Sequence, residues 1–387
     1  MSILLALPWA LAWLMFLRLA RRTPRVEDVP PLVSGGPAVS VIIPARNESR
    51  TIATVVASIL ASSYHDLEVI VVDDCSTDDT AEQVSRLATR DPRLRLLKGA
   101  ALPAGWFGKP WACVQGARAA RGDILLFTDA DTRHDPRLLP HTVGALEAGR
   151  GDLITVAPHQ RCDTFWERVV MPQIWALLGF RFHPASVNRA RHRRDVIANG
   201  QYILLRRATY DRIGTHEAVR AEVAEDLALA QETAASGLRV WFAFALSLME
   251  TRMYHSLPHL IEGWSKNIHL GGRKSFPDEP LLRAAVPVAL AGWFLGWLLP
   301  PIALAAALAG LMPIPALPAG IATALSAGFW MVMSRGMRIP AGYGLLYPAG
   351  AALALWIVLR SSWRGSRLVE WKDRTYAANG ARSGGVE

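Results

Sequence analysis

The chain has 387 residues, enough for one large domain or two small ones, and 51% of them are hydrophobic. Its formal net charge of +9 suits anionic lipid beside membrane segments, so we expect a lipid bilayer partner and no nucleic acid. The three cysteines, Cys75, Cys113 and Cys162, have no metal-ligand spacing and are odd in number, which argues against a disulfide framework and indicates a reducing compartment.

The first predicted element is an apolar helix over residues 1–20. No charged residue precedes Arg18, and neither a basic leader nor a small-residue cleavage site is evident. A membrane-spanning helix needs roughly 20 mostly apolar residues, so the pattern predicts an uncleaved membrane anchor. Three arginines follow within residues 21–25, which predicts that the next domain is cytoplasmic, at the inner membrane. The Pro- and Gly-rich residues 21–37 are expected to form a linker.

Residues 38–270 alternate short apolar strands with helical periods. Strands are expected at 39–43, 67–72, 93–97, 124–128 and 153–156, and helices at 48–60, 78–89, 110–120 and 228–235. Asn47 or Ser49 is the expected cap of the first helix and Ser76 that of the second. This alternation predicts an α/β fold, a mostly parallel sheet with helices on both faces. Ligands of such sheets bind at the carboxyl ends of the strands.

Acidic side chains follow two of these strands. Asp73 and Asp74 end the second strand, and Asp129 and Asp131 follow an apolar run. Strand residues two apart share a face, so Asp129 and Asp131 can reach one point. Their hard oxygen ligands suit a divalent cation that bridges to substrate phosphates. A solvated acid pair in a loop is the alternative reading of the same pattern.

Two further polar groups accompany these acids. Pro44, Ala45, Arg46 and Glu48 lie at the end of the first strand, and Glu222-Val-Ala-Glu225-Asp226 opens a helix. A carboxylate there can act as a general base. Acids in a first helical turn can also be no more than favourable partners of the helix dipole.

The motifs PxRNE, VDDxSxDxT, DAD and ED, in this order, resemble those of the family 2 glycosyltransferases, which have the GT-A fold. The resemblance covers residues 38–270. It implies a site in which Pro44, Ala45, Arg46, Glu48, Asp73, Asp74 and Glu225 contact the nucleotide sugar. It also implies that Asp129 and Asp131 bind the diphosphate through Mg²⁺ or Mn²⁺. Asp226 would deprotonate an acceptor hydroxyl, with inversion at the anomeric carbon.

The chain resembles more closely a membrane-bound branch that glycosylates lipids, including chlorobactene-type carotenoid glucosyltransferases and hopanoid-associated relatives. The matching segments are GWFGKPWAC at 105–113, NGQY at 199–202, RMY at 252–254, EGWSKN at 262–267 and WKDRTY at 371–376. Lys109 could reach a donor phosphate as a point charge, or be a helix-start cation in water. Trp264 and Lys266 stand where processive relatives carry QxxRW, and Lys266 could replace that arginine beside the diphosphate.

The absence of QxxRW favours transfer of a single sugar over polymer synthesis. The resemblance therefore implies a metal-dependent, inverting hexosyltransferase. It would move one hexose, with glucose favoured, from a nucleotide sugar such as a UDP-hexose to a hydroxylated membrane lipid such as a carotenoid or hopanoid. Two alternatives stay open. One is transfer to a polyprenyl phosphate, which needs no general base, and the other is a non-catalytic membrane scaffold.

Residues 271–360 are expected to form a membrane region, with two crossings in 284–334 and a third in 339–359. An odd number would leave the C-terminus outside, whereas the basic tail at 361–387 favours the cytoplasm. A break at Pro300-Pro301, making 284–311 a re-entrant hairpin or two short helices, is one resolution. A helix over 257–270 could lie in the interface. The basic residues between Arg189 and Arg194 could lie on lipid or form a solvated loop.

Overall fold

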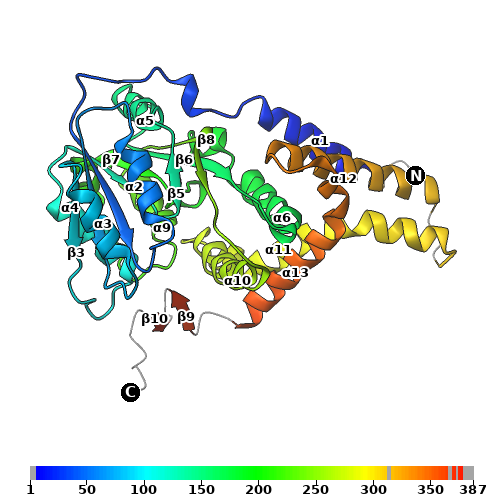
Figure 1. Cartoon of the computed structure of the whole chain (residues 1–387). Helices are drawn as coiled ribbons and strands as arrows, with labels where there is room; N and C mark the ends of the chain where they lie inside the picture. The colour runs from blue at the N-terminus through cyan, green and yellow to red at the C-terminus, as the bar shows by residue number, and fades with distance from the viewer. Residues whose placement is uncertain (1–5, 312–314, 365–367, 372–373, 378–387) are drawn as a thin grey trace.

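The computed structural model describes residues 6–311, 315–364, 368–371 and 374–377 (Figure 1). Within them, one large sheet has the strand order β3-β2-β1-β4-β7-β6-β8-β5. Its strands are β1 (Val39–Ala45), β2 (Leu67–Asp73), β3 (Leu94–Lys98), β4 (Ile124–Phe127), β5 (Thr132–His134), β6 (Leu153–Gln160), β7 (Ile203–Arg206) and β8 (Val240–Thr251). The first four strands in this order are parallel. β7 is antiparallel to β4 and β6, and β8 is parallel to β6 but antiparallel to β5.

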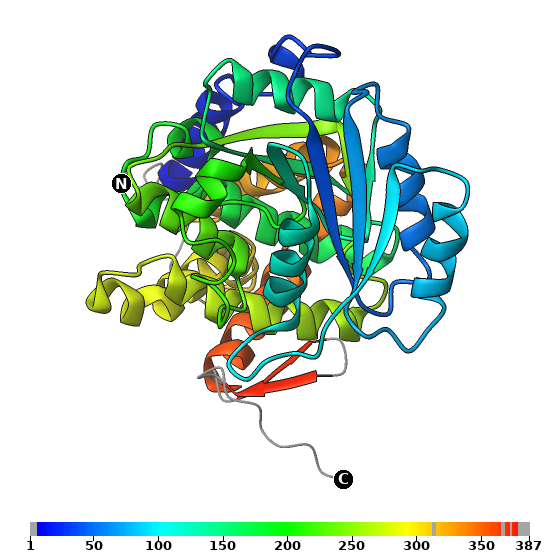
Figure 2. The same ribbon diagram turned by 90° about the vertical axis from the view of Figure 1, so that its left-hand side faces the viewer.

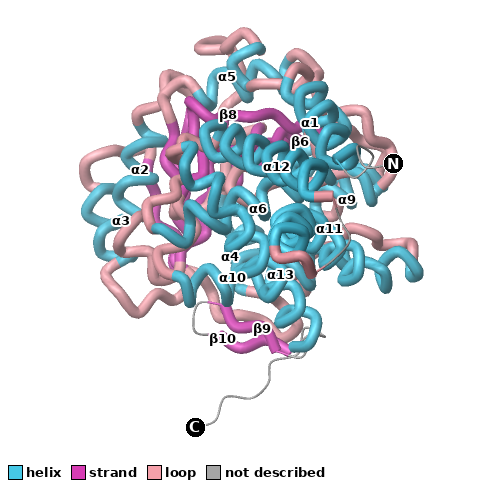
Figure 3. Tube along the Cα trace, turned by 90° about the vertical axis from the view of Figure 1, so that its right-hand side faces the viewer, coloured by secondary structure: helices cyan, strands magenta, loops and turns pink. Residues whose placement is uncertain are grey.

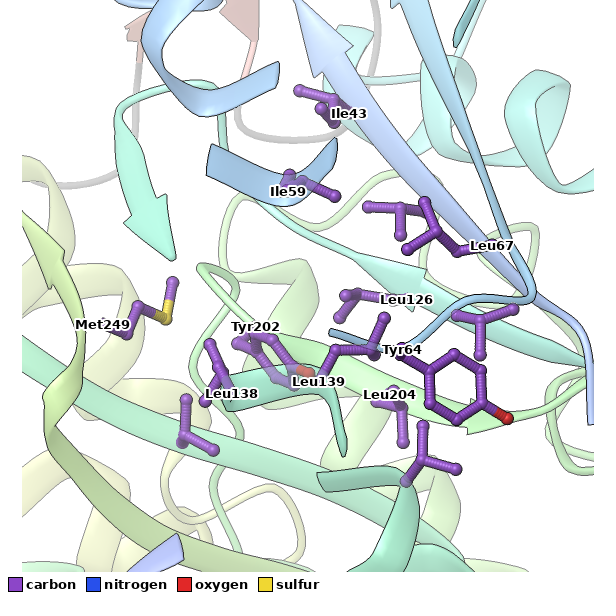
Figure 4. Packing of buried hydrophobic residues seen from close by; sticks show 14 of the residues in the cluster. Ile43, Ile59, Tyr64, Leu67, Leu126, Leu138, Leu139, Tyr202, Leu204 and Met249 are labelled. Atoms are coloured by element: carbon purple, nitrogen blue, oxygen red, sulfur yellow. The ribbon is translucent and has the colours of Figure 1, made fainter. Parts of the chain in front are cut away.

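Both faces of the sheet are buried under helices, which explains the near-continuous apolar strands. On β4, Ile124 and Leu126 face one cluster of buried side chains, while Leu125 and Phe127 face the other. The first face is covered by α2 (Ile52–Leu60), α3 (Thr80–Ala88) and α5 (Leu138–Glu147), and the second by α4 (Gly108–Ala119), α8 (Arg207–Arg212) and α9 (Glu225–Ala235). Figure 2 views this sheet with helices on both sides. Figure 4 shows Ile59 and Leu138 packed in the first cluster with Leu126.

The predicted start of the first helix was wrong. α2 begins at Ile52 with Thr51 at its N-cap position, not with Asn47 or Ser49. Asn47 has a φ of 54°, and the Glu48 N–H donates to Thr80 Oγ1 at 2.8 Å, so this stretch is a loop tied to its neighbour. Likewise α3 begins at Thr80 after Asp79, and the Ser76 hydroxyl accepts instead from the Asn47 N–H.

The C-terminal region is made of helices packed side by side, which Figure 3 shows in front of the sheet domain. They are α10 (Leu257–Lys274), α11 (Pro280–Leu308), α12 (Ala316–Gly336), the 3₁₀ helix η4 (Ala341–Leu346) and α13 (Tyr347–Arg364). Three stretches of the described residues are long and apolar enough to cross a membrane: Pro280–Leu308, Ala316–Gly336 and Ala341–Trp363. Their surfaces expose large apolar side chains such as Leu281 (85%), Val288 (74%) and Trp363 (93%), which suits contact with lipid.

The break considered at Pro300-Pro301 does not occur. α11 is one helix of 29 residues that runs through Pro287, Pro300 and Pro301. Proline removes a helical hydrogen bond, but neighbouring helices can hold such a span in place. Here α11 packs against both α12 and α13, with Trp297 and Pro300 buried.

The N-terminal helix α1 (Leu7–Ala20) has 14 described residues, fewer than a spanning helix needs, and residues 1–5 lie outside the described part. It packs on the bundle formed by the C-terminal helices α10 to α13. There Trp13 Nε1 donates to the Leu325 carbonyl at 2.9 Å, and the Trp13 ring meets Phe329 edge-on. Its role as a membrane anchor therefore stays a prediction. The following segment docks on the sheet domain through η2 (Val26–Asp28), in which Val26 is fully buried.

The sheet domain and the bundle are joined by α6 (Phe165–Arg181), which was not predicted from the sequence. Its apolar side chains share one cluster with those of α10, α11, α12 and α13. An ion pair adds a second junction, because Arg194 pairs with Glu279 before α11 at 2.6 Å. The neighbouring Arg193 pairs with Glu232 of α9 at 2.7 Å, within the sheet domain. These two arginines of the basic cluster therefore contact protein carboxylates.

Smaller elements complete the described chain. They are α7 (Pro184–Val187), η3 (Arg193–Asp195) and the antiparallel pair of β9 (Leu368–Trp371) and β10 (Arg374–Ala377). Residues 365–367, 372–373 and 378–387 of the basic tail lie outside the described residues.

Candidate active site

The loops after β1 and β2 interlock at the carboxyl edge of the sheet. The Asp74 N–H donates to the Ala45 carbonyl at 2.8 Å. Arg46 Nη1 donates to the carbonyls of Asp74 and Cys75 at 2.8 and 2.9 Å. The predicted site residues Pro44, Ala45 and Arg46 thus lie beside Asp73 and Asp74, with the Arg46 guanidinium joining the two loops.

Acids of the β2 loop are stabilised by hydrogen bonds from the protein. Asp73 Oδ1 accepts from the Ser76 N–H at 3.2 Å. Asp78 accepts from the Ser49 N–H at 3.0 Å and from the Thr80 N–H at 3.0 Å. Burial alone would raise the pKa of Asp78, but hydrogen bonds from the side chains and backbone N–H groups of Thr80 and Ser49 outweigh it and lower the pKa to about 2. Hydrogen bonds from within the protein therefore stabilise the negative charges of Asp73 and Asp78.

Lys109 brings together acids that are far apart in the sequence. Its Nζ lies 2.6 Å from Asp129 Oδ1 and 2.7 Å from Glu225 Oε1. Lys109 stands in the first turn of α4, Asp129 follows β4, and Glu225 opens α9. Burial opposes the charge on Lys109, but Asp129, Glu225 and Asp226 outweigh it and raise its pKa well above the usual value. The ammonium is thus a fixed cation at the centre of the site.

The ionised form of Asp131, next to this cluster, is disfavoured by its surroundings. Burial, followed by the charges of Asp129 and Glu48, raises the pKa of Asp131 to about 7. Its buried Oδ1 has no hydrogen-bond partner among the described residues. No group of three or more His, Cys, Asp or Glu side chains in that part of the chain could hold a metal ion by itself. Two carboxylates with an orphaned buried oxygen nevertheless fit a divalent cation whose remaining ligands come from a phosphate.

Asp226 is oriented by two backbone N–H groups. Its Oδ2 accepts from the Gly200 N–H at 2.9 Å, and its Oδ1 accepts from the Leu227 N–H at 2.7 Å. Burial, and then the charge of Glu225, raises the pKa of Asp226 to about 6, although Lys109 and the two N–H groups oppose the shift. The carboxylate is therefore a fixed group of raised basicity.

Gly200 was missed as a site residue, although NGQY had been noted as a matching segment. A Cβ at this position would lie 3.0 Å from Lys109 Nζ and 3.1 Å from Asp226 Oδ2. A larger residue here would require Lys109 or Asp226 to shift by a few tenths of an ångström, which glycine avoids. The sequence offered the motif as a signal but no indication of which side chain its backbone would touch.

The two α10 residues have different surroundings. Burial lowers the pKa of Lys266 to about 8, while the charge of Glu225 opposes that shift, so Lys266 lies within electrostatic reach of the acid cluster. Trp264 is buried among apolar side chains of the bundle, with its Nε1 donating to Met171 Sδ at 3.3 Å and its ring near Trp175. Contact of Trp264 with a nucleotide sugar stays a prediction.

With this geometry in view, residues 40–225 match the model described as glycosyl transferase family 2. These residues, a little under half of the chain, therefore resemble a family 2 glycosyltransferase domain. A mannosyltransferase from Pyrobaculum calidifontis, PcManGT, solved in complex with GDP-Man and Mn²⁺, is similar in structure, with a TM-score of 0.59 and 22% identity over 94% of this chain and 99% of that one. This likeness shows the fold, and the predicted GT-A architecture is confirmed.

Among curated proteins, the chain is similar to two 4,4'-diaponeurosporenoate glycosyltransferases. The protein of Staphylococcus haemolyticus is 26% identical over 254 residues, 63% of this chain and 64% of the relative. The protein of Staphylococcus aureus strain MRSA252 is 27% identical over 263 residues, 66% of each. The match therefore spans a little under two thirds of the length of these relatives.

Proposed function

We propose that this protein is a family 2 glycosyltransferase that moves one hexose, with inversion, from a nucleotide sugar to a membrane lipid of the carotenoid class. The observation that carries the proposal is the Lys109–Asp129–Glu225–Asp226 cluster at the carboxyl ends of the strands, with Lys266 of α10 within electrostatic reach. α10 continues into helices long enough to cross a membrane. A lipid could thus keep its tail in the bilayer and bring its polar end to the acids. Glucose, a UDP donor and a cytoplasmic site at the inner membrane belong to the same proposal.

The donor would bind at the strand ends. Pro44, Ala45, Glu48, Asp73 and Asp74, which lie in or beside the two interlocked loops, would contact the nucleotide. Asp129 and Asp131 would hold Mg²⁺ or Mn²⁺, which as a Lewis acid stabilises the charge of a leaving nucleoside diphosphate. The ammonium groups of Lys109 and Lys266 would add positive charge beside the diphosphate.

Asp226 would act as the general base. Its carboxylate accepts the proton of the acceptor hydroxyl as that oxygen forms a bond to the anomeric carbon. The bond from the anomeric carbon to the diphosphate oxygen breaks with its electron pair going to the leaving group. A single displacement of this kind inverts the anomeric carbon. The N–H groups of Gly200 and Leu227 hold the base in one orientation, which reduces the entropy lost on reaching the transition state.

The test is Asp226→Asn, assayed with a carotenoid alcohol as acceptor. We expect turnover to fall about 10²–10⁴-fold, the usual contribution of a general base, while nucleotide binding persists. Because the base must be ionised, wild-type turnover should rise with pH through about 6, and the variant should lack this rise. Glu232→Gln on the same helix, whose partner is Arg193, is the control. Full activity of Asp226→Asn would refute the base assignment.

A second candidate acceptor is a carotenoid carboxylic acid. The name of the similar staphylococcal enzymes, 4,4'-diaponeurosporenoate glycosyltransferase, denotes a carboxylate acceptor for those proteins. A carboxylate is already anionic and needs no base to remove a proton. With such an acceptor, Asp226→Asn should keep most of its turnover, so assaying both acceptor classes with the one variant separates the two candidates.

A further inference from the structure

His134 lies in a buried polar cluster behind the turn that carries Asp129 and Asp131. The side chains of His134, Thr128 and Thr132 are 7%, 1% and 3% exposed. His134 Nε2 is 3.1 Å from Thr128 Oγ1 and 3.2 Å from Thr132 Oγ1. None of these three side chains has a part in the mechanism described above, although buried polar groups in a core cost free energy unless they are paired.

The positions of the hydroxyl protons decide the state of this histidine. Thr128 Oγ1 donates to the Gln201 carbonyl at 2.7 Å, and Thr132 Oγ1 donates to the Asp129 carbonyl at 2.8 Å. A threonine hydroxyl has one proton. The two hydroxyl oxygens lie 3.3 Å apart, but each has a closer carbonyl, at 2.7 and 2.8 Å, that can only accept, so we assign both protons to the carbonyls. Each hydroxyl can therefore only accept from His134, so Nε2 must carry a proton that the two oxygens share. Burial lowers the pKa of His134 to about 3, which leaves the ring neutral with a bare Nδ1.

The two carbonyls belong to the two halves of the site. Asp129 begins the turn that carries Asp129 and Asp131. At the other end of this turn, the Thr251 hydroxyl donates to the Asp131 carbonyl at 3.2 Å. Gln201 follows Gly200, whose N–H orients Asp226 at 2.9 Å. One imidazole N–H thus fixes, through two hydroxyls, the turn of the proposed cation ligands and the turn that holds the proposed base.

We propose that His134 is a positioning residue of the donor site, which acts through Thr128 and Thr132 to hold Asp129 and Asp131 in the geometry that binds a divalent cation with a nucleoside diphosphate. The inference rests on the proposed function, because that function gives the two acids their ligand. It adds residues that contact neither cation nor substrate. Groups that orient metal ligands in this way commonly contribute about 10–100-fold to metal affinity.

The experiment titrates Mn²⁺ into the full-length protein in detergent micelles by calorimetry, with UDP present and again with GDP. We expect His134→Leu to weaken Mn²⁺ affinity by about 10–100-fold, as loss of an orienting group does, and Thr132→Val to weaken it in the same direction. His134→Gln should retain most of the affinity, because the Gln amide nitrogen is as many bonds from Cβ as Nε2 is and can donate in its place. Melting temperatures of all variants are measured in parallel.

Thr142→Val is the matched control. Thr142 is fully buried and its Oγ1 lies 2.6 Å from the Tyr202 hydroxyl, so the same isosteric change removes a buried hydrogen bond away from the acids. We expect it to lower the melting temperature but leave Mn²⁺ affinity unchanged. If His134→Leu does not fold, Thr132→Val against Thr142→Val makes the same comparison.

The outcomes separate this inference from the function on which it rests. Wild-type Mn²⁺ affinity in both His134→Leu and Thr132→Val would overturn the positioning role alone. An equal loss of affinity in Thr142→Val would also overturn it, because general loosening of the core would then explain the effect. If the wild type binds neither UDP nor GDP with Mn²⁺, the proposed function fails and the inference fails with it.

Discussion

The ends of strands β2 and β4 carry similar sequences, an apolar run followed by acids, yet the protein surrounds these acids in different ways. After β2, Asp73 and Asp78 accept backbone N–H groups, and the pKa of Asp78 is lowered to about 2. After β4, burial and neighbouring carboxylates raise the pKa of Asp131 to about 7. The first loop stabilises its own anions. The second concentrates negative charge that Lys109 offsets only in part.

This difference separates the structural role of Asp78 from the cation-binding role proposed for Asp129 and Asp131. A buried charge without a partner costs free energy, and proteins commonly accept that cost where a ligand supplies the missing partner. The charge of Asp78 is already stabilised by hydrogen bonds from the protein. The β4 turn would gain stability from a cation or a cation–phosphate complex, and three predictions test the contrast.

The largest expected effect is that of Asp131→Asn. Loss of a cation ligand should remove several kcal/mol of transition-state stabilisation, about 10³-fold or more in turnover. The same change removes one of the crowded carboxylates, so the melting temperature of the ligand-free protein should rise. Activity assays test for the fall in turnover, and thermal unfolding tests for the rise in melting temperature. A variant that is both active and less stable would show that the β4 acids behave like those of β2.

Lys109→Met should have the next largest effect. It removes the cation shared by Asp129 and Glu225, and breaking a buried ion pair typically costs about 3–5 kcal/mol. With 21% of the Lys109 side chain exposed, we expect a value at the lower end, measured by denaturant unfolding. Arg118→Met is the control, because its pair with Glu217 is largely exposed and such pairs contribute roughly 0–1 kcal/mol. Equal losses in the two variants would refute the central role of Lys109.

Asp78→Asn should have the smallest effect and appear only in stability. The loop loses a charged acceptor of several hydrogen bonds, which should cost about 1–3 kcal/mol at neutral pH. Because the folded pKa lies below the ordinary value of 3.8, this contribution is present above about pH 4 and is lost as the pH falls toward 2. The difference in melting temperature between wild type and variant should therefore shrink over that range. A difference independent of pH would contradict the assignment.

Much of the fold could be predicted because its signals are local. Apolar strands in alternation with helices predicted the covered sheet, and the acids after β2 and β4 marked its ligand-binding edge. The apolar stretches near the C-terminus predicted the three long helices. Local rules failed where a distant loop competed for the backbone. Glu48 and Ser49 donate to Thr80 and Asp78 instead of starting α2, and packing against α12 and α13 carries α11 through Pro300 and Pro301.

The sequence by itself determined which residues could form a site, because the residue types and their places at strand ends are properties of the chain order. Only the tertiary structure decided which of them meet. Lys109 reaches Asp129 and Glu225, about twenty and more than a hundred residues away, and Gly200 meets Asp226 through its backbone N–H. His134 and Thr132 carried no signal at all, since an ordinary histidine and threonine acquire a role only when burial commits each proton to one partner.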